Sequence, residues 1–165
     1  MNLASLYVDV ENLRDIAQQV IVQTVKDWPI EFPKPNTMHL YVSADQTHLW
    51  ELWASHQFPL IKISVHGVQR YSSVTKNSAD ISLVLKALAD LLKGRSTHVA
   101  ILSDDSDYIA LFKAINTEIP RDQRNLLPFL WFITDRSDTH SRSLKTFIPP
   151  LYFHIIASQE DNKPE

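Results

Sequence analysis

The sequence contains no cysteine and only two glycines, Gly67 and Gly94. Without cysteine the chain can form no disulfide, no thiolate zinc site and no cysteine nucleophile. Walker loops and glycine-rich dinucleotide loops both need several glycines within a short stretch, which this chain does not have. These absences exclude thiol chemistry and the two commonest nucleotide-binding loops.

Long hydrophobic runs and an excess of positive charge are also missing. The longest apolar runs, such as residues 127–133, are too short to cross a bilayer, and residues 1–8 lack the basic flank of a signal peptide. We therefore expect a cytoplasmic protein without membrane contact. The formal net charge is −3, so a polyanionic partner must be met by a local basic patch or through bound metal.

The chain instead has a regular alternation of apolar and amphipathic segments over 165 residues, of which 44% are hydrophobic. Strand-like runs alternate with segments of helical period, which predicts βαβ units and an α/β fold with a mostly parallel central sheet of about five strands and helices on both faces. The expected strands are 3–10, 38–44, 60–68, 98–103 and 127–134, and the expected helices are 13–25, 46–57, 77–92 and 106–115. We expect one domain over residues 1–157 and a polar tail over 158–165.

Aspartates gather where these segments meet. Four of the five expected strands end in aspartate, and another aspartate opens the longest helix: Asp9, Asp45, Asp104 with Asp105, Asp135, and Asp80 on the helix. Because sites in open α/β sheets form outside the carboxyl ends of the strands, these carboxylates are expected at one edge. An oxygen-rich pocket of this kind suits Mg²⁺ or Mn²⁺.

Each aspartate also has an ordinary structural interpretation. Asp105 suits the N-cap of the helix at 106–115, and Asp107 its first turn. Asp80 suits the start of its helix, whereas Asp45 and Asp135 suit turns. It is their joint occurrence that favours a site.

Three blocks of sequence then resemble a known family: LYVDVENL (6–13), KNSADISLVLKALADLL (76–92) and ILSDDSDYIALF (101–112). In order and spacing they are similar to the signature blocks of NYN-domain proteins, in their LabA-like branch, within the PIN-like nuclease superfamily. The resemblance implies a PIN-like three-layer sandwich and a metal-dependent ribonuclease. The matching residues are Asp9, Asn12, Asp80, Ser103, Asp105, Ser106, Asp107 and Tyr108.

The resemblance also implies roles. The catalytic set would be Asp9, Asn12, Asp80, Asp105 and Asp107. Its four aspartates would hold one or two Mg²⁺ or Mn²⁺ ions that activate water, polarise the scissile phosphate and neutralise the leaving 3′-oxygen. Asn12 would hydrogen-bond phosphate, water or a carboxylate. The groups expected around the ligands are Ser103, Ser106 and Asp104.

RNA, more readily single-stranded, is the expected partner, and a homodimer is left open. The loop after residues 127–134 should open at the same edge as the aspartates, with a second basic group just before Asp80. The expected phosphate-contacting residues are Arg70, Lys76, Arg136, His140, Ser141 and Arg142. An ordinary solvated loop is the alternative interpretation.

The chain departs from the family pattern at three positions, one of which is the region of Ile148, Pro149 and Pro150, where relatives often carry an aspartate near their final strand. Asp104 stands where glycine is usual, and Lys86 stands where many relatives carry an acidic residue. These departures keep open a catalytically weak or silent PIN-like module that binds RNA or a protein. A phosphatase of the haloacid dehalogenase type is a more distant alternative, because Glu11 stands where that chemistry needs a second aspartate.

Overall fold

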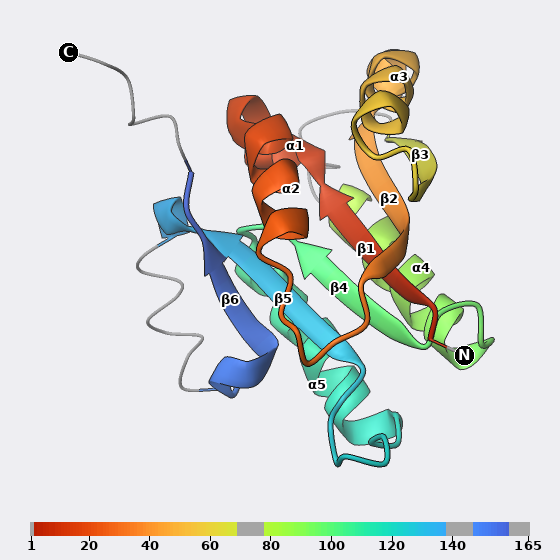
Figure 1. The fold of residues 1–165 in the computed structure, drawn as a ribbon, viewed down its shortest axis with the longest axis vertical. Coiled ribbons are helices and arrows are strands. Elements are labelled where there is room, and N and C mark those ends of the chain that lie inside the picture. Colours follow the sequence, from red (N-terminus) through yellow and green to blue (C-terminus); the bar gives the residue numbers. More distant parts are fainter. Residues whose placement is uncertain (1, 69–77, 138–146, 159–165) are drawn as a thin grey trace.

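A computed structural model of the chain describes residues 2–68, 78–137 and 147–158. All strands that it describes run parallel in a single six-stranded sheet of order β3-β2-β1-β4-β5-β6 (Figure 1). The strands are β1 (Ala4–Asp9), β2 (Pro35–Ser43), β3 (Lys62–Val68), β4 (His98–Leu102), β5 (Phe129–Thr134) and β6 (Phe153–Ile156). The predicted α/β fold with a parallel sheet is confirmed.

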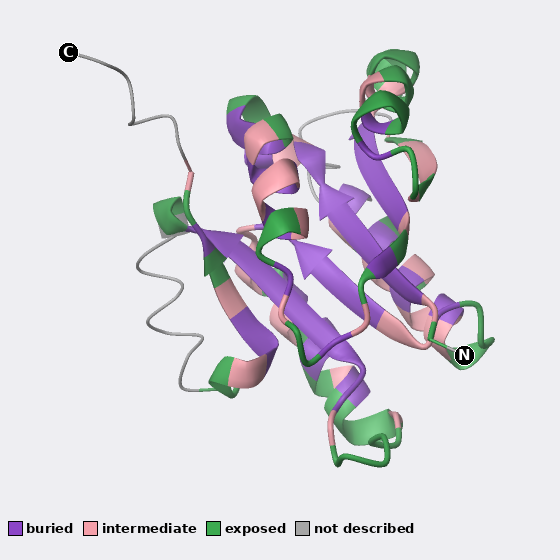
Figure 2. Ribbon diagram, in the orientation of Figure 1, coloured by how far each residue is buried: buried purple, intermediate pink, exposed green. Residues whose placement is uncertain are grey.

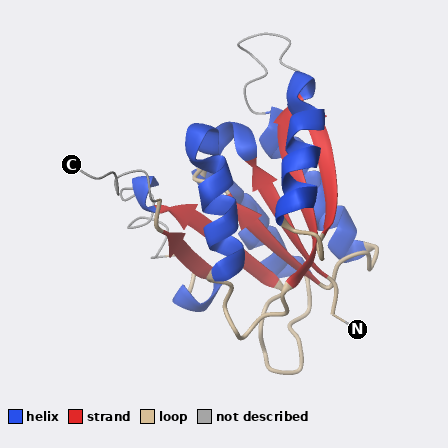
Figure 3. Cartoon of the chain, turned by 45° about the horizontal axis from the view of Figure 1, so that its top comes forward, coloured by secondary structure: helices blue, strands red, loops and turns tan. Residues whose placement is uncertain are grey.

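Helices cover both faces of the sheet and complete three layers. One layer holds α1 (Val10–Leu13), α2 (Ala17–Lys26) and α3 (Thr47–Gln57), and the other holds α4 (Ser78–Leu92) and α5 (Ile109–Glu118) (Figures 1 and 3). Every residue of β1 and of β5 is buried, as expected for central parallel strands packed on both sides (Figure 2). No helix in the described part of the chain is long and apolar enough to span a membrane.

Two local features differ from the sequence prediction. The expected helix over 13–25 is broken into α1, a 3₁₀ turn over Arg14–Ile16 and α2, and Arg14 has φ 58° and ψ −129° at the break. The strand β6 was not predicted, because its four residues follow Pro149 and Pro150 and are too few to show a period.

The strand order decides where a site can form. The chain leaves β1 towards β2 on one side, whereas β4 pairs with β1 on the other, so the sheet has its topological switch point between β1 and β4. In such sheets ligands bind outside the carboxyl ends of the strands that flank this point. Those ends carry Asp9 and the segment that begins at Ser103.

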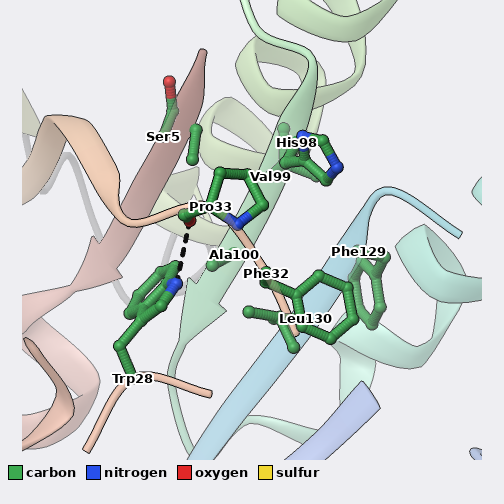
Figure 4. Close-up of a pocket in the computed structure, with 10 residues that line it drawn as sticks. Ser5, Trp28, Phe32, Pro33, His98, Val99, Ala100, Phe129 and Leu130 are labelled. Atoms are coloured by element: carbon green, nitrogen blue, oxygen red, sulfur yellow. Dashed lines mark hydrogen bonds between the residues drawn. The ribbon is translucent and has the colours of Figure 1, made fainter. Parts of the chain in front are cut away.

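The opposite edge of the sheet holds the amino ends of the strands. A void of about 10 Å³ lies near the amino ends of β1, β4 and β5, among side chains that include Phe32, Val99 and Phe129 (Figure 4). Trp28 Nε1 closes it with a hydrogen bond of 2.9 Å to the Pro33 carbonyl. The void has room for one water at most.

A buried polar network lies between α4 and the sheet. The Tyr7 hydroxyl donates to Asp90 Oδ2 at 2.6 Å, and Arg95 Nε donates to Asp90 Oδ1 at 2.6 Å. The His39 ring stacks on Tyr7 at 4.6 Å, and its Nδ1 lies 3.0 Å from His66 Nε2. The two imidazoles therefore share one hydrogen bond, which requires that at least one of these nitrogens is unprotonated.

This network predicts that acid destabilises the protein through His39. Burial, and then the neighbouring His66, lowers the pKa of His39 from 6.5 to about 4. Below pH 6.5 His39 is protonated in the unfolded chain but stays neutral in the folded chain. The free energy of unfolding therefore decreases as the pH falls from 6.5 towards 4. In urea unfolding, wild type should lose on the order of 1–2 kcal/mol more than His39→Gln between pH 7 and about pH 5. Parallel losses in the two proteins would contradict this assignment.

Candidate metal centre

Asp9 is the most buried carboxylate at the switch point. It closes β1, is 2% exposed and caps α1, where its Oδ1 accepts from the Asn12 N–H at 3.4 Å. Its Oδ2 accepts from the Tyr108 hydroxyl at 3.1 Å and from the Ser103 hydroxyl at 3.4 Å. Burial raises the pKa of Asp9. The side chain is thus held by three donors from two segments of the chain.

Asp80 approaches the same point from the first turn of α4. Its Oδ1 accepts from the Tyr108 hydroxyl at 3.4 Å, whereas its Oδ2 is buried and accepts no hydrogen bond from the residues that the structure describes. Burial, and then the nearby carboxylates of Asp105 and Asp9, raises the pKa of Asp80 to about 9. Two carboxylates that close share a proton unless a cation takes its place.

Asp105 and Asp107 follow β4 and complete the cluster. Asp105 caps the 3₁₀ turn Ser106–Tyr108, accepting from the Asp107 N–H at 2.9 Å, and its own N–H donates to the Ser103 hydroxyl at 3.1 Å. One carboxylate oxygen each from Asp80, Asp105 and Asp107 lies within 4.8 Å of the others. The capping interpretation of Asp105 is therefore correct, and it coexists with a set of ligand atoms spaced as for one cation.

Tyr108 links the carboxylates and is the residue whose part in the site the sequence showed least clearly. Its ring is fully buried, packs at 6.4 Å against Trp131, and brings its hydroxyl to both Asp9 and Asp80. Burial and these carboxylates raise the pKa of Tyr108, so the hydroxyl stays a donor. The signal in the sequence was the tyrosine itself, at a core position of the block 101–112. Phenylalanine would pack equally well there, but it would leave the carboxylates without the hydroxyl donor.

Asp104 turns away from the cluster. Its carboxylate accepts from the Thr134 N–H at 2.6 Å and from the Thr134 hydroxyl at 2.7 Å, at the end of β5. Its N–H donates to Asn12 Oδ1 at 2.8 Å. Among the described non-glycine residues only Arg14 and Asn125 have positive φ, so the backbone at Asp104 has no need of glycine.

The other predicted residues are dispersed. Asp45 and Asp135 are exposed and stand outside the cluster, and Asp135 accepts from the Ser158 N–H at 3.2 Å. Lys86 lies on another side of α4, where it donates to Asp90 at 3.0 Å. Arg136 is at the same sheet edge as the aspartates and lies 3.6 Å from Asp15, an exposed ion pair of little net strength. The remaining predicted phosphate contacts fall outside the described residues: Arg70, Lys76, His140, Ser141 and Arg142.

Glu11, which stands where the phosphatase alternative needs a second aspartate, lies away from the carboxylate cluster. Glu11 Oε2 accepts from the Ser43 hydroxyl at 2.7 Å, which directs this side chain to the end of β2. Ser106, predicted beside the ligands, is half-buried in the turn between Asp105 and Asp107.

A comparison with family models and one with solved structures each found a match. The family model of the NYN domain matches residues 4–119, a range that includes every member of the carboxylate cluster. No curated protein matches the chain. A solved structure of similar fold is a protein of unknown function from Vibrio parahaemolyticus, with a TM-score of 0.57 and 14% identity over 97% of this chain and 94% of that one.

Proposed function

The chain belongs to the NYN-domain family, and from that premise we propose that it is a metal-dependent ribonuclease that hydrolyses RNA phosphodiester bonds. The observation that carries the proposal is the buried Asp80 Oδ2, which accepts no hydrogen bond from the described residues and belongs to a carboxylate that clusters with those of Asp105 and Asp107. A buried, unpartnered carboxylate oxygen is costly unless something positive meets it. We also propose that the chain belongs to the LabA-like branch of the family, because its three sequence blocks resemble that branch.

The residues of the cluster fit Mg²⁺ or Mn²⁺. Both ions prefer oxygen ligands, few of them from protein, which matches three carboxylates that are half-buried or exposed. When bound, such an ion supplies a nucleophile at neutral pH and stabilises charge on the phosphate. Asp80, Asp105 and Asp107 would hold the first ion. Asp9 would join them as a ligand or hold a second ion, because its carboxylate shares the Tyr108 hydroxyl with Asp80.

The neighbouring groups position the carboxylates and the substrate. Ser103 and Tyr108 fix Asp9 by donating to Oδ2. Asn12 Oδ1 already accepts from the Asp104 N–H. We therefore propose that the Asn12 side-chain N–H₂ donates to a phosphate oxygen of the RNA. Arg136 would exchange its weak pair with Asp15 for a phosphate.

The catalytically silent module remains the second candidate, and Lys86 is its support. Lys86 stands where many relatives carry an acidic residue, and its charge is paired with Asp90. A cytoplasmic location and a homodimer stay predictions.

The test is cleavage of labelled single-stranded RNA, duplex RNA and DNA with Mn²⁺, with Mg²⁺ or with a chelator. We expect single-stranded RNA to be cut in the presence of either metal, with products that carry 5′-phosphate, and no cutting in chelator. Binding of RNA without any metal-dependent cleavage would favour the silent module. Equal cutting in chelator would show that the metal has no part in the reaction.

A further inference from the structure

An open cavity of about 380 Å³ lies between α1, the end of β2 and α3. We call it the Trp50 cavity, and its lining residues are Val10, Glu11, Arg14, Ser43, Gln46 and Trp50. Val10 and Glu11, which line the cavity, directly follow Asp9 at the start of α1. Figure 1 shows α1 leaving the carboxyl end of β1. The volume lies in the range of small-ligand pockets.

Trp50 gives the cavity a rigid aromatic wall. Its indole is half-buried and meets the Trp53 ring edge-on at 5.5 Å, and Trp53 in turn meets Phe58 edge-on at 5.9 Å. The row of rings anchors Trp50 to the core while the indole still lines the cavity. An aromatic surface of this kind stacks with any nucleobase.

Arg14 places a positive charge at the cavity. It is exposed, and its φ of 58° with ψ of −129° is a conformation that glycine adopts far more readily than arginine. The N–H of Arg14 holds this backbone in place by donating to the Val10 carbonyl. Unfavourable backbone of this kind persists mainly where function retains it, and a guanidinium is well suited to phosphate.

Hydrogen-bonding groups complete the lining. The Ser43 hydroxyl holds the Glu11 carboxylate at 2.7 Å, and the Gln46 side chain is exposed beside them. A carboxylate and an amide can together accept from and donate to the edge of a base.

From these features we propose that the Trp50 cavity binds a nucleoside of the RNA next to the phosphate that is cleaved. Trp50 stacks on the base, Glu11 and Gln46 meet its edge, and Arg14 contacts the adjoining phosphate. The assignment rests on the proposed ribonuclease function, since it places the cavity along the path of the substrate.

The test measures binding apart from cleavage. Full-length Asp105→Asn in chelator is titrated into a short fluorescein-labelled single-stranded RNA, and affinity is read by anisotropy. Adding Trp50→Ala should weaken binding about 5- to 100-fold, whereas Trp50→Phe should stay within about 3-fold because it keeps the stacking surface. Leu52→Ala, an exposed change on the same helix, is the matched control and should leave binding unchanged.

The outcomes separate the two proposals. Equal affinity with and without Trp50→Ala, or no binding by the parent, overturns the cavity assignment, while the ribonuclease proposal is decided by cleavage of wild type. Loss of affinity with Trp50→Ala supports the cavity even if wild type cuts no RNA.

Arg14→Gly separates recognition from folding. Glycine takes the observed φ without strain, so we expect the melting temperature to hold or rise while RNA affinity falls several-fold and the salt dependence loses about one phosphate contact. Unchanged affinity would remove Arg14 from the site.

Discussion

Asp80→Asn and Asp105→Asn should each lower metal-dependent RNA cleavage by at least about 100-fold, more than is typical for loss of a group that only orients a ligand. Asparagine keeps the shape of aspartate and removes the charge that a divalent ion needs. The decisive readout is thermal. Mn²⁺ should raise the melting temperature of wild type, because an ion that binds only the folded state stabilises it, and this response should be lost in Asp80→Asn.

Without metal, Asp80→Asn should melt higher than wild type at neutral pH. The pKa of Asp80 is raised to about 9, so the folded chain holds a proton that the unfolded chain releases above pH 3.8. The free energy of unfolding therefore falls as the pH rises from 3.8 to 9, so at neutral pH Asp80 already destabilises the folded chain, and asparagine removes this cost. A residue with a purely structural role would give the opposite order of melting temperatures.

Asp45→Asn is the matched control. Asp45 also follows a strand at the carboxyl edge, yet it is exposed and outside the cluster. It should leave cleavage and the Mn²⁺ response unchanged. If Asp45→Asn and Asp105→Asn cut equally well, the cluster is not the catalytic site.

The sequence predicts the fold well because periodicity is local information. Buried parallel strands and amphipathic helices each have a pattern that is visible in a short window. The break at Arg14 has no such signal, since arginine is not typical of positive φ and the position is held by the Val10 carbonyl.

The candidate site is likewise predicted only as far as local sequence patterns reach. Asp9, Asp80 and Asp105 are expected together because strand ends and the helix flank place them, and the structure brings them together. Asp45 and Asp135 also follow the ends of strands, but they lie apart from the cluster. Their strands, β2 and β5, are each one strand farther from the switch point, and neighbouring strands are spaced about 4.8 Å apart.

The hydrogen-bond partner of Asp104 could not be predicted from the local sequence. Its partner Thr134 is thirty positions away in the sequence and is brought near only when β4 pairs with β5. From sequence the residue was an added charge beside the metal site, whereas in the structure its carboxylate binds the end of β5.

Asp104→Gly, which installs the usual NYN residue, should therefore destabilise the protein by about 2–4 kcal/mol without raising the cleavage rate of the folded enzyme. Glycine offers no acceptor, so the buried Thr134 N–H and hydroxyl lose their partners together. Asp104→Asn retains one acceptor oxygen and should cost about half as much. Urea unfolding measures both, alongside initial cleavage rates at saturating Mn²⁺.

A double-mutant cycle with Thr134→Val assigns the loss to this pair. Valine removes the hydroxyl donor in advance, so Asp104→Gly should then cost about 1 kcal/mol less than it does in wild type. If Asp104→Gly is as stable as wild type and cuts faster, the carboxylate opposes catalysis and the departure from the family pattern is functional. Both oxygens of Asp104 already accept hydrogen bonds from Thr134. We therefore expect Asp104→Gly to destabilise the protein without faster cleavage, because the Asp104 carboxylate is bound to the end of β5 and leaves the metal-binding carboxylates unchanged.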